Sequence, residues 1–274
     1  MPRIELAEQA GVDVRGASRP TEDRVVVLDN AVLVLDGATT LRAGLPSGGW
    51  YAEELSARLG AMLTAEPHAD LAETLAKSIA DLRDTHGLRP GAAPSSTVAM
   101  LRWQEQQLDA LVLADSPIIA FHRDASWAAL TDDRLGNLPR GPGGYRSRLR
   151  TGAGFGEEHL AAVTEGSRRT GSWRNVEGGF WVAEADPAAA HQARRASWPR
   201  ATIDAVLLAT DGVSCAVDDY GLYTWPQLLE LARAEGPQSV LDAIRAAERA
   251  DHTGARWPRP KLHDDQALAL LTNW

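Results

Sequence analysis

The sequence predicts an α+β protein whose strands form antiparallel sheets. Short β-branched runs occur together early in the chain, and helical patterns occur together between and after them. Strands in clusters and helices in clusters are typical of antiparallel α+β architectures, whereas a parallel sheet would alternate strand with helix. No Gly-x-Gly-x-x-Gly sequence follows a predicted strand, and no phosphate-binding loop of the Walker type is present. The pattern therefore argues against the usual nucleotide-binding folds.

Composition narrows the function classes further. The 274 residues are 44% hydrophobic and 24% charged, which is typical of globular proteins. A net charge of −9 argues against binding nucleic acid through a basic surface. The single cysteine, Cys215, excludes an internal disulfide and a cysteine-rich zinc site. No apolar run reaches the roughly 18–20 residues of a membrane span, and residues 1–19 lack the apolar core of a secretory signal. We therefore expect one cytoplasmic domain, residues 1–274, that binds neither nucleic acid nor membrane.

The strand predictions begin with a hairpin. Arg24–Leu28 and Ala31–Leu35 are apolar runs separated by the two residues Asp29-Asn30, a spacing typical of a tight turn. A meander of three strands is predicted next, at Ser96–Trp103, Leu108–Ala114 and Ile118–His122. The late strands are predicted at Gly179–Ala183, Ile203–Thr210 and Gln266–Leu271.

Helical periodicity occurs in four segments. They are Trp50–Leu63, Leu71–Leu82 with Asp70 as its N-cap, Trp225–Ala234 and Gln238–Ala250. The stretch from Leu138 to Gly156 has no period and is rich in Gly, Pro and Arg (Arg140, Arg146, Arg148, Arg150). It predicts a mobile loop, the first part of a flap-like insertion around residues 138–200 whose arginines are candidates to steer a substrate.

The hairpin places two carboxylates opposite each other. With a two-residue turn, Asp23 before the first strand pairs with Asp36 after the second. Directly opposed residues have Cβ atoms about 4.5–5.5 Å apart on one face, where like charges repel. The pairing is favourable only if a cation lies between the two groups or water screens them.

Further acidic residues flank two late strands. Asp211 follows the strand at 203–210, and Asp264-Asp265 precede the strand at 266–271. If these strands are antiparallel, the carboxylates meet at one edge of the sheets, where oxygen ligands suit Mg²⁺ or Mn²⁺. An alternative stays open. Asp36-Gly37 and Asp211-Gly212 are also common turn dipeptides, and Asp264-Asp265 is also typical of a solvated edge.

Six short motifs containing acidic or hydroxyl residues follow one another along the chain. They are Thr21-Glu22-Asp23, Val34-Leu35-Asp36-Gly37, Ser95-Ser96-Thr97, Leu113-Ala114-Asp115-Ser116, Leu208-Ala209-Thr210-Asp211-Gly212-Val213 and His263-Asp264-Asp265. In this order the chain resembles the metal-dependent protein phosphatases of the 2C type, the PPM family. The segment from Arg174 to Pro187 resembles an actinobacterial variant group of that family.

The resemblance implies a fold, a cofactor and a set of ligands. The fold would be a four-layer αββα sandwich, two antiparallel β-sheets flanked by helices. Two Mn²⁺ or Mg²⁺ ions would lie at its end, with Asp36 bridging both and the Gly37 carbonyl binding one. Asp211 and Asp264 would bind the other ion, and Asp23 would act through waters. Asp115 matches a position associated with a third, weaker metal.

The chain departs from the family pattern at several positions. The usual Asp-Gly-x-Gly-Gly is replaced by residues 36–40, Asp-Gly-Ala-Thr-Thr, and a glycine pair recurs only at Gly48-Gly49. The histidine that often follows the motif is missing. Asp265 stands where many members have Asn, and Ala114 where they have Gly. Arg19 lies one residue closer to Asp23 than the phosphate-binding arginine of some members. These changes imply altered substrates or lowered activity.

The expected function is metal-dependent dephosphorylation of serine and threonine in phosphoprotein substrates. A metal-activated bridging water would attack the phosphate monoester in line, with Asp36 and Asp211 as the catalytic carboxylates. Cysteine phosphatases are excluded because their Cys-x5-Arg motif would need an arginine at position 221, where this chain has Gly221 after Cys215. His263 is a candidate proton donor or a histidine with a purely structural role. The alternative function is a catalytically weak or inactive regulatory module that keeps the phosphatase fold.

Overall fold

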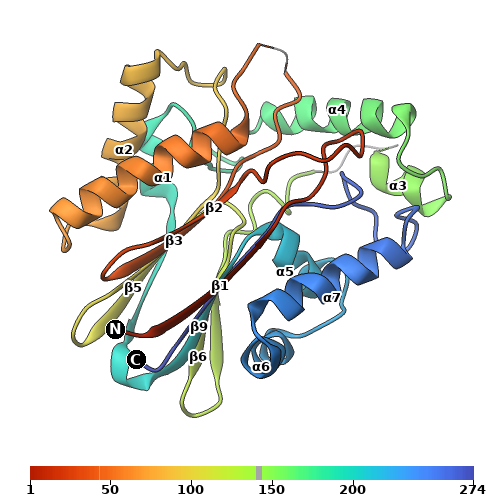
Figure 1. Ribbon diagram of the computed structural model, residues 1–274. Helices are drawn as coiled ribbons and strands as arrows, with labels where there is room; N and C mark the ends of the chain where they lie inside the picture. The colour runs from red at the N-terminus through yellow and green to blue at the C-terminus, as the bar shows by residue number, and fades with distance from the viewer. Residues whose placement is uncertain (43, 140–143) are drawn as a thin grey trace.

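Two five-stranded antiparallel sheets form the centre of the molecule (Figure 1). The computed structural model describes residues 1–42, 44–139 and 144–274. The first sheet has, in spatial order, β1 (Arg3–Gln9), β10 (Gln266–Thr272), β9 (Ile203–Ala209), β6 (Ile118–His122) and β7 (Trp127–Leu130). The second has β2 (Asp23–Val27), β3 (Ala31–Asp36), β4 (Val98–Trp103), β5 (Gln107–Leu113) and β8 (Arg194–Pro199).

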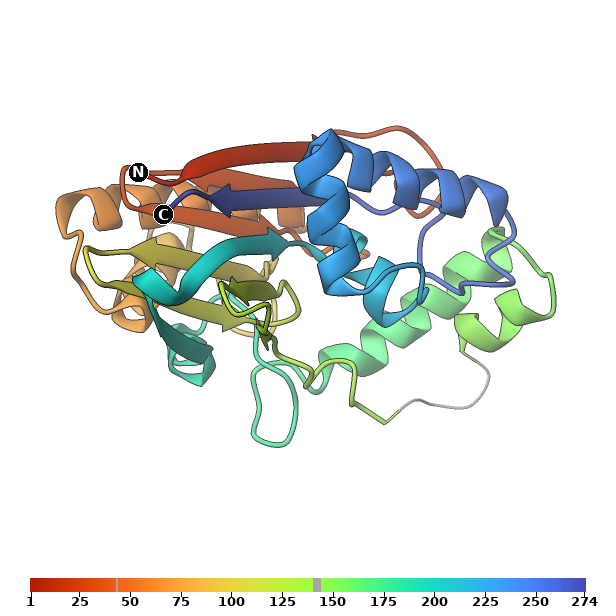
Figure 2. The same cartoon turned by 90° about the horizontal axis from the view of Figure 1, so that it is seen from below.

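Helices cover both outer faces of the pair of sheets (Figures 1 and 2). α1 (Gly48–Ala65) and α2 (Leu71–His86) pack on the second sheet. α5 (Asp211–Asp218), α6 (Trp225–Glu235) and α7 (Pro237–Ala250) pack on the first. α3 (Tyr145–Arg150) and α4 (Glu157–Gly171) lie at one end of the sandwich. Two short 3₁₀ helices complete the elements, at Pro187–Gln192 and Arg200–Thr202.

The alternation of side chains along β3 shows how the four layers are held. Leu33 and Leu35 pack under α1 and α2, while Val32 and Val34 pack between the two sheets against residues of β9 and β10. Successive side chains of a strand point to opposite faces, so a strand covered on both faces is apolar at every position. The expectation of a four-layer αββα sandwich with antiparallel sheets is confirmed.

Most predicted elements have their counterparts in the structure. The hairpin has the expected register, with Asp23 opposite Asp36 and Val26 opposite Leu33. Asp70 caps α2 as predicted, because its side chain accepts hydrogen bonds from the backbone N–H groups of Ala72 and Glu73. The four predicted helices form, with ends that differ from the sequence pattern by up to four residues.

The strand predicted at Gly179–Ala183 is wrong. This segment makes only isolated bridges, between Phe180 and Arg174 and between Ala183 and Ser96. A tight turn directs its backbone groups elsewhere, since Phe180 N–H donates to the Trp173 carbonyl at 3.0 Å. The apolar run is therefore buried without joining a sheet ladder.

The prediction of an irregular loop over residues 138–156 is also wrong in part. Residues 145–150 form α3, and two of the arginines are paired on the surface. Arg146 Nη1 lies 3.3 Å from Asp219 Oδ1, and Arg148 pairs with Glu158. Arg140 lies outside the described residues. These ion pairs give the arginines a structural partner, and a steering role stays a prediction.

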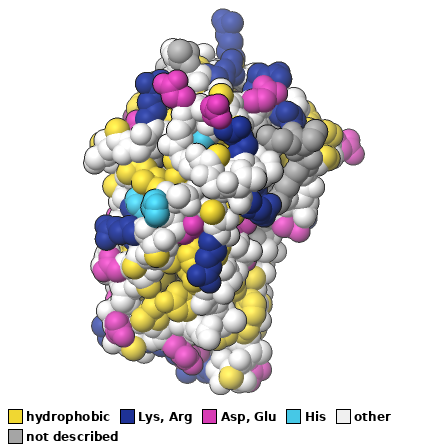
Figure 3. Space-filling view, turned by 90° about the vertical axis from the view of Figure 1, so that its right-hand side faces the viewer, with side chains coloured by type: hydrophobic (Ala, Val, Ile, Leu, Met, Phe, Trp, Pro, Cys, Tyr) yellow, Lys and Arg dark blue, Asp and Glu magenta, His cyan; other side chains and the backbone are white. Residues whose placement is uncertain are grey.

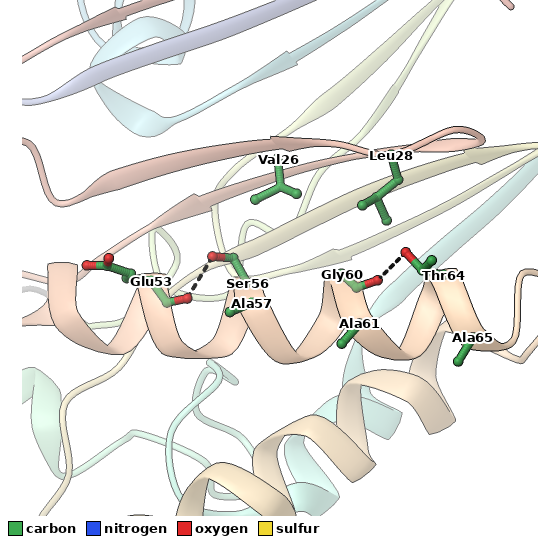
Figure 4. A pocket seen from close by; sticks show the side chains of 9 residues that line it. All are labelled: Val26, Leu28, Glu53, Ser56, Ala57, Gly60, Ala61, Thr64 and Ala65. Atoms are coloured by element: carbon green, nitrogen blue, oxygen red, sulfur yellow. Dashed lines mark hydrogen bonds between the residues drawn. The ribbon is translucent and has the colours of Figure 1, made fainter.

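One groove on the surface is lined by none of the predicted metal ligands. It has a volume of about 550 Å³ and lies between α1 and the hairpin residues Val26 and Leu28 (Figure 4). Its walls include none of the acidic residues that the sequence assigns to the metal site.

On the face shown in Figure 3, basic and acidic side chains alternate around an apolar patch. Among the described residues, we find no helix with the length and apolarity needed to cross a membrane.

Candidate metal centre

The hairpin and its neighbouring strand position the first two carboxylates. Asp23 opens β2, Asp36 ends β3, and the two lie directly opposite each other. The backbone N–H of Asp36 donates to Thr97 Oγ1 at 3.0 Å, and Ser96 Oγ donates to the Asp36 carbonyl at 2.9 Å. The Ser95-Ser96-Thr97 motif therefore fixes the end of β3.

The other sheet supplies the next carboxylates to the same end of the sandwich. Asp211 follows β9, and its carboxyl group lies within hydrogen-bonding reach of the Asp36 carboxyl group. Thr210 joins the two sheets here, because its Oγ1 donates to Asp23 Oδ2 at 2.8 Å and accepts from the Ala267 N–H at 3.0 Å. Asp264 lies close enough to raise the pKa values of Asp36 and Asp211.

The glycines of the two Asp-Gly motifs allow this close approach. A Cβ atom on Gly212 would lie 1.9 Å from the carbonyl oxygen of Asp265, and one on Gly37 would lie 2.4 Å from the carbonyl carbon of Gly48. Neither Gly37 nor Gly212 has a positive φ. Asp211-Gly212 instead begins α5, and Gly37 forms an isolated bridge with Ser96, so the interpretation of these dipeptides as turns is wrong. The contact also places Gly48-Gly49, displaced in sequence, beside Asp36-Gly37 in space.

The carboxylates are close together at a cost in electrostatic energy. Burial and the neighbouring acids Asp265, Asp211 and Asp264 raise the pKa of Asp23, against a hydrogen bond from Thr210. Burial, and then the charges of Asp23 and Asp264, raise the pKa of Asp36 well above its usual range, and burial, followed by the charges of Asp36 and Asp264, does the same for Asp211. Asp23 is 1% exposed, and its Oδ1 atom has no hydrogen-bond partner in the structure. A buried carboxylate oxygen without a partner indicates that a ligand belongs beside it.

Asp115 lies at the margin of this group. It follows β5, and burial, together with the charges of Asp132 and Asp264, raises its pKa to about 6. Ala114 before it has a φ of 65°, a left-handed conformation that glycine adopts more readily than alanine. Alanine in this conformation is a source of local backbone strain beside Asp115.

A buried lysine that the sequence analysis did not single out also lies here. Lys261 forms an ion pair with Asp264, and its Nζ lies 3.1 Å from Thr39 Oγ1. Thr39 Oγ1 donates in turn to Glu22 Oε2 at 2.9 Å. Lys261 follows a proline and precedes no strand directly, so no pattern in the sequence marked it. Its spacing of three residues from Asp264 was the available signal.

Arg19 and Asp265 form an ion pair beside the acidic group. Arg19 Nη2 lies 2.6 Å from Asp265 Oδ2, and Arg19 Nη1 lies 2.9 Å from Glu22 Oε2. Asp265 Oδ1 also accepts a hydrogen bond from the backbone N–H of Gly11 at 2.7 Å. A carboxylate stands where the phosphatase family often has an amide, and a guanidinium neutralises it.

His263 has a structural partner. Its Nδ1 lies 2.8 Å from Glu248 Oε2, in a network that includes Arg245 and Tyr220. Between the two roles that the sequence left open, these contacts favour the structural one.

Cys215 is half-buried, its Sγ donates to the Gly212 carbonyl at 3.4 Å, and burial raises the pKa of its thiol. It has none of the features of an activated nucleophile.

The groups gathered here have the chemistry of a site for a hard divalent ion. Carboxylate oxygens and a backbone carbonyl are the ligands that Mg²⁺ and Mn²⁺ prefer, and the unpartnered Asp23 oxygen fits such an ion or its water. Within residues 1–42, 44–139 and 144–274, however, no three acidic, imidazole or thiol groups form an arrangement ready to hold an ion. Asp264, which such an arrangement would need, is paired with Lys261.

Comparison with solved structures identifies the architecture. The chain is similar to the serine/threonine phosphatase Stp1 from Staphylococcus aureus, with 14% identity, a TM-score of 0.57 and coverage of 100% of this chain and 96% of that one. It is also similar to the PPM phosphatase MsPP from Mycobacterium smegmatis in complex with cacodylate, with 16% identity, a TM-score of 0.58 and coverage of 99% and 98%.

A third similar structure is the catalytic domain of the serine/threonine protein phosphatase PstP in complex with two manganese ions. It shows 16% identity and a TM-score of 0.57, with coverage of 99% of this chain and 97% of that one. No protein-family model and no curated protein matches the sequence. The order and packing of its strands and helices nevertheless give the whole chain the fold of the PPM-type serine/threonine phosphatases.

Proposed function

We propose that the chain is a metal-dependent phosphatase that removes phosphate from serine and threonine in proteins. The contact between the Asp36 and Asp211 carboxyl groups, which come from different sheets, carries this proposal. Like charges that a fold holds together at a cost are typical of a cation-binding or catalytic site. The fold shared with PPM-type phosphatases supports the same reaction class.

The reaction explains why such a centre is useful. Hydrolysis of phosphate monoesters without a catalyst is among the slowest reactions known. Divalent ions bound here would neutralise phosphate charge and lower the pKa of a coordinated water so that it can attack in line. The manganese ions in the PstP structure support Mn²⁺ or Mg²⁺ as the cofactor.

Each of the predicted ligands has a role in this proposal. Asp36 would hold both ions, and the Gly37 carbonyl would bind one of them. Asp211 and Asp264 would bind the other, and Asp23 would orient coordinated waters through its free oxygen. Asp115, at the margin, would contribute to a third and weaker site. By fixing these oxygens before the substrate arrives, the two sheets supply a preorganised electrostatic environment.

The test is hydrolysis of p-nitrophenyl phosphate and of a phosphothreonine peptide by the purified full chain. We expect turnover with Mn²⁺, loss of turnover with a chelator and recovery when Mn²⁺ is returned, because a divalent ion would be needed to offset the acidic side chains and to activate a water. Turnover that is unchanged by the chelator would contradict the metal-dependent mechanism.

A second candidate function is a regulatory or binding module that keeps the fold but not the activity. The ion pair between Lys261 and Asp264 favours it, since it engages one of the carboxylates that a two-ion centre would use. A folded chain that neither binds Mn²⁺ nor hydrolyses either substrate would support this candidate and contradict the first.

A further inference from the structure

We propose that the Lys261 ammonium group replaces one of the two divalent ions, so that this centre binds a single ion tightly. The inference rests on the proposed metal-dependent function and specifies how the charge of its site is balanced. Lys261 is 8% exposed and pairs with Asp264, the carboxylate on one side of the acidic group. The ammonium therefore already occupies the surroundings of a cation.

A chain of contacts fixes the position of this ammonium. Lys261 Nζ donates to Thr39 Oγ1 at 3.1 Å, and Thr39 Oγ1 donates to Glu22 Oε2 at 2.9 Å. Glu22 is itself held by Arg19 at 2.9 Å. Thr39 belongs to the residues that separate Asp36-Gly37 from Gly48-Gly49, where the family motif is continuous. The change in that motif and the buried lysine thus meet at one hydrogen bond.

Lys261 lies between two of the proposed ligands. Its ammonium forms an ion pair with Asp264, and the Asp36 carboxylate is also close enough to interact with it electrostatically. The ammonium therefore acts on the carboxylate proposed to bridge two ions as well as on the one it contacts.

The charges around the centre leave room for one divalent ion. Asp264 is paired with Lys261 and Asp265 with Arg19. Among the described residues, no arginine or lysine forms an ion pair with Asp23, Asp36 or Asp211. One divalent ion neutralises most of this remaining group. A second ion beside Asp264 would have to displace the ammonium or bind next to a like charge.

The choice of lysine agrees with this role. Only two of the 28 basic side chains are lysines, and the other, Lys77, is exposed on α2. An ammonium is a compact point charge, whereas a guanidinium is a broad planar group. The compact group is the better substitute for a metal ion within a cluster of carboxylates.

The experiment measures Mn²⁺ binding to the full chain by titration calorimetry and by electron paramagnetic resonance, without substrate. We expect one tightly bound ion in the unmodified protein. Lys261→Met and Lys261→Gln remove the charge, and Gln keeps a hydrogen-bonding group for Thr39. In each variant that is folded by circular dichroism, we expect a second ion whose Kd is at least about tenfold tighter than in the unmodified protein. Lys77→Met is the matched control and should bind one ion.

The outcomes separate this inference from the proposed function. Two ions bound with similar tight affinity by the unmodified protein would overturn the replacement by Lys261 and leave the metal-dependent function intact. Unchanged stoichiometry and affinity in both Lys261 variants would do the same. Absence of Mn²⁺ binding in the unmodified protein and in both variants would overturn the proposed function itself, and this inference with it.

Discussion

Replacing Asp36 with asparagine is expected to reduce Mn²⁺-dependent hydrolysis on the order of 10³-fold, because the substitution removes the charge that would hold the ion and its water. The same change should not destabilise the metal-free protein. Burial and the Asp23 and Asp264 carboxylates raise the Asp36 pKa, so its ionised form is unfavourable in the folded state without metal. A neutral isostere avoids that cost, and we expect an equal or higher melting temperature.

The matched control for this prediction is Asp29→Asn. Asp29 is exposed in the turn of the same hairpin, at the end opposite Asp36. Its substitution should change neither the hydrolysis rate nor the melting temperature. Mn²⁺-dependent turnover that survives in Asp36→Asn, measured with p-nitrophenyl phosphate after metal removal and reloading, would contradict the assignment of Asp36.

Replacing Gly212 with alanine is expected to have the second large effect, on stability and metal binding together. The new Cβ atom would lie 1.9 Å from the carbonyl oxygen of Asp265, a backbone atom that cannot rotate away. The strand end that carries Asp264 must therefore move away from Asp211. We expect a loss of about 3 kcal/mol or more in the free energy of unfolding, measured in urea, and weaker Mn²⁺ binding.

Gly166→Ala is the control for the chemistry of this substitution. Gly166 lies within α4, where a Cβ atom would meet nothing within 4 Å. Alanine is favoured over glycine inside a helix, so this variant should gain about 0.5–1 kcal/mol. If Gly212→Ala were as stable as the unmodified protein, the close packing of residues 212 and 265 would not be a requirement of the fold.

The parts of the fold predicted from sequence are those whose pattern is set by the buried core. The hairpin register followed from a two-residue turn and two apolar runs, and it correctly placed Asp23 opposite Asp36. The strands that the sequence did not reveal are β1, β7 and β8, and each lies at the edge of a sheet. Edge strands such as β8 (Arg194–Pro199) are largely polar or half-exposed, so they lack the apolar runs that mark central strands.

In the candidate site, too, some residues could be predicted from the sequence and others could not. The acidic residues at strand ends could be predicted, because strand order and direction place them at one end of the sandwich. Lys261, Thr39 and Glu22 could not, since they lie in connecting segments whose path depends on long-range contacts. The glycines were misjudged for a related reason. Gly212 is required by a segment more than fifty residues away in the chain, which a local turn pattern does not reveal.

The most direct test of the central claim is a crystal structure of the chain soaked in Mn²⁺, with anomalous diffraction recorded at the manganese absorption edge. The account predicts an anomalous peak between the Asp36 and Asp211 carboxylates, on the side that the free oxygen of Asp23 faces. A Mn²⁺-soaked crystal with no peak there, and with the Asp36 and Asp211 carboxyl groups still within hydrogen-bonding reach of each other, would contradict the claim that these carboxylates form a metal centre.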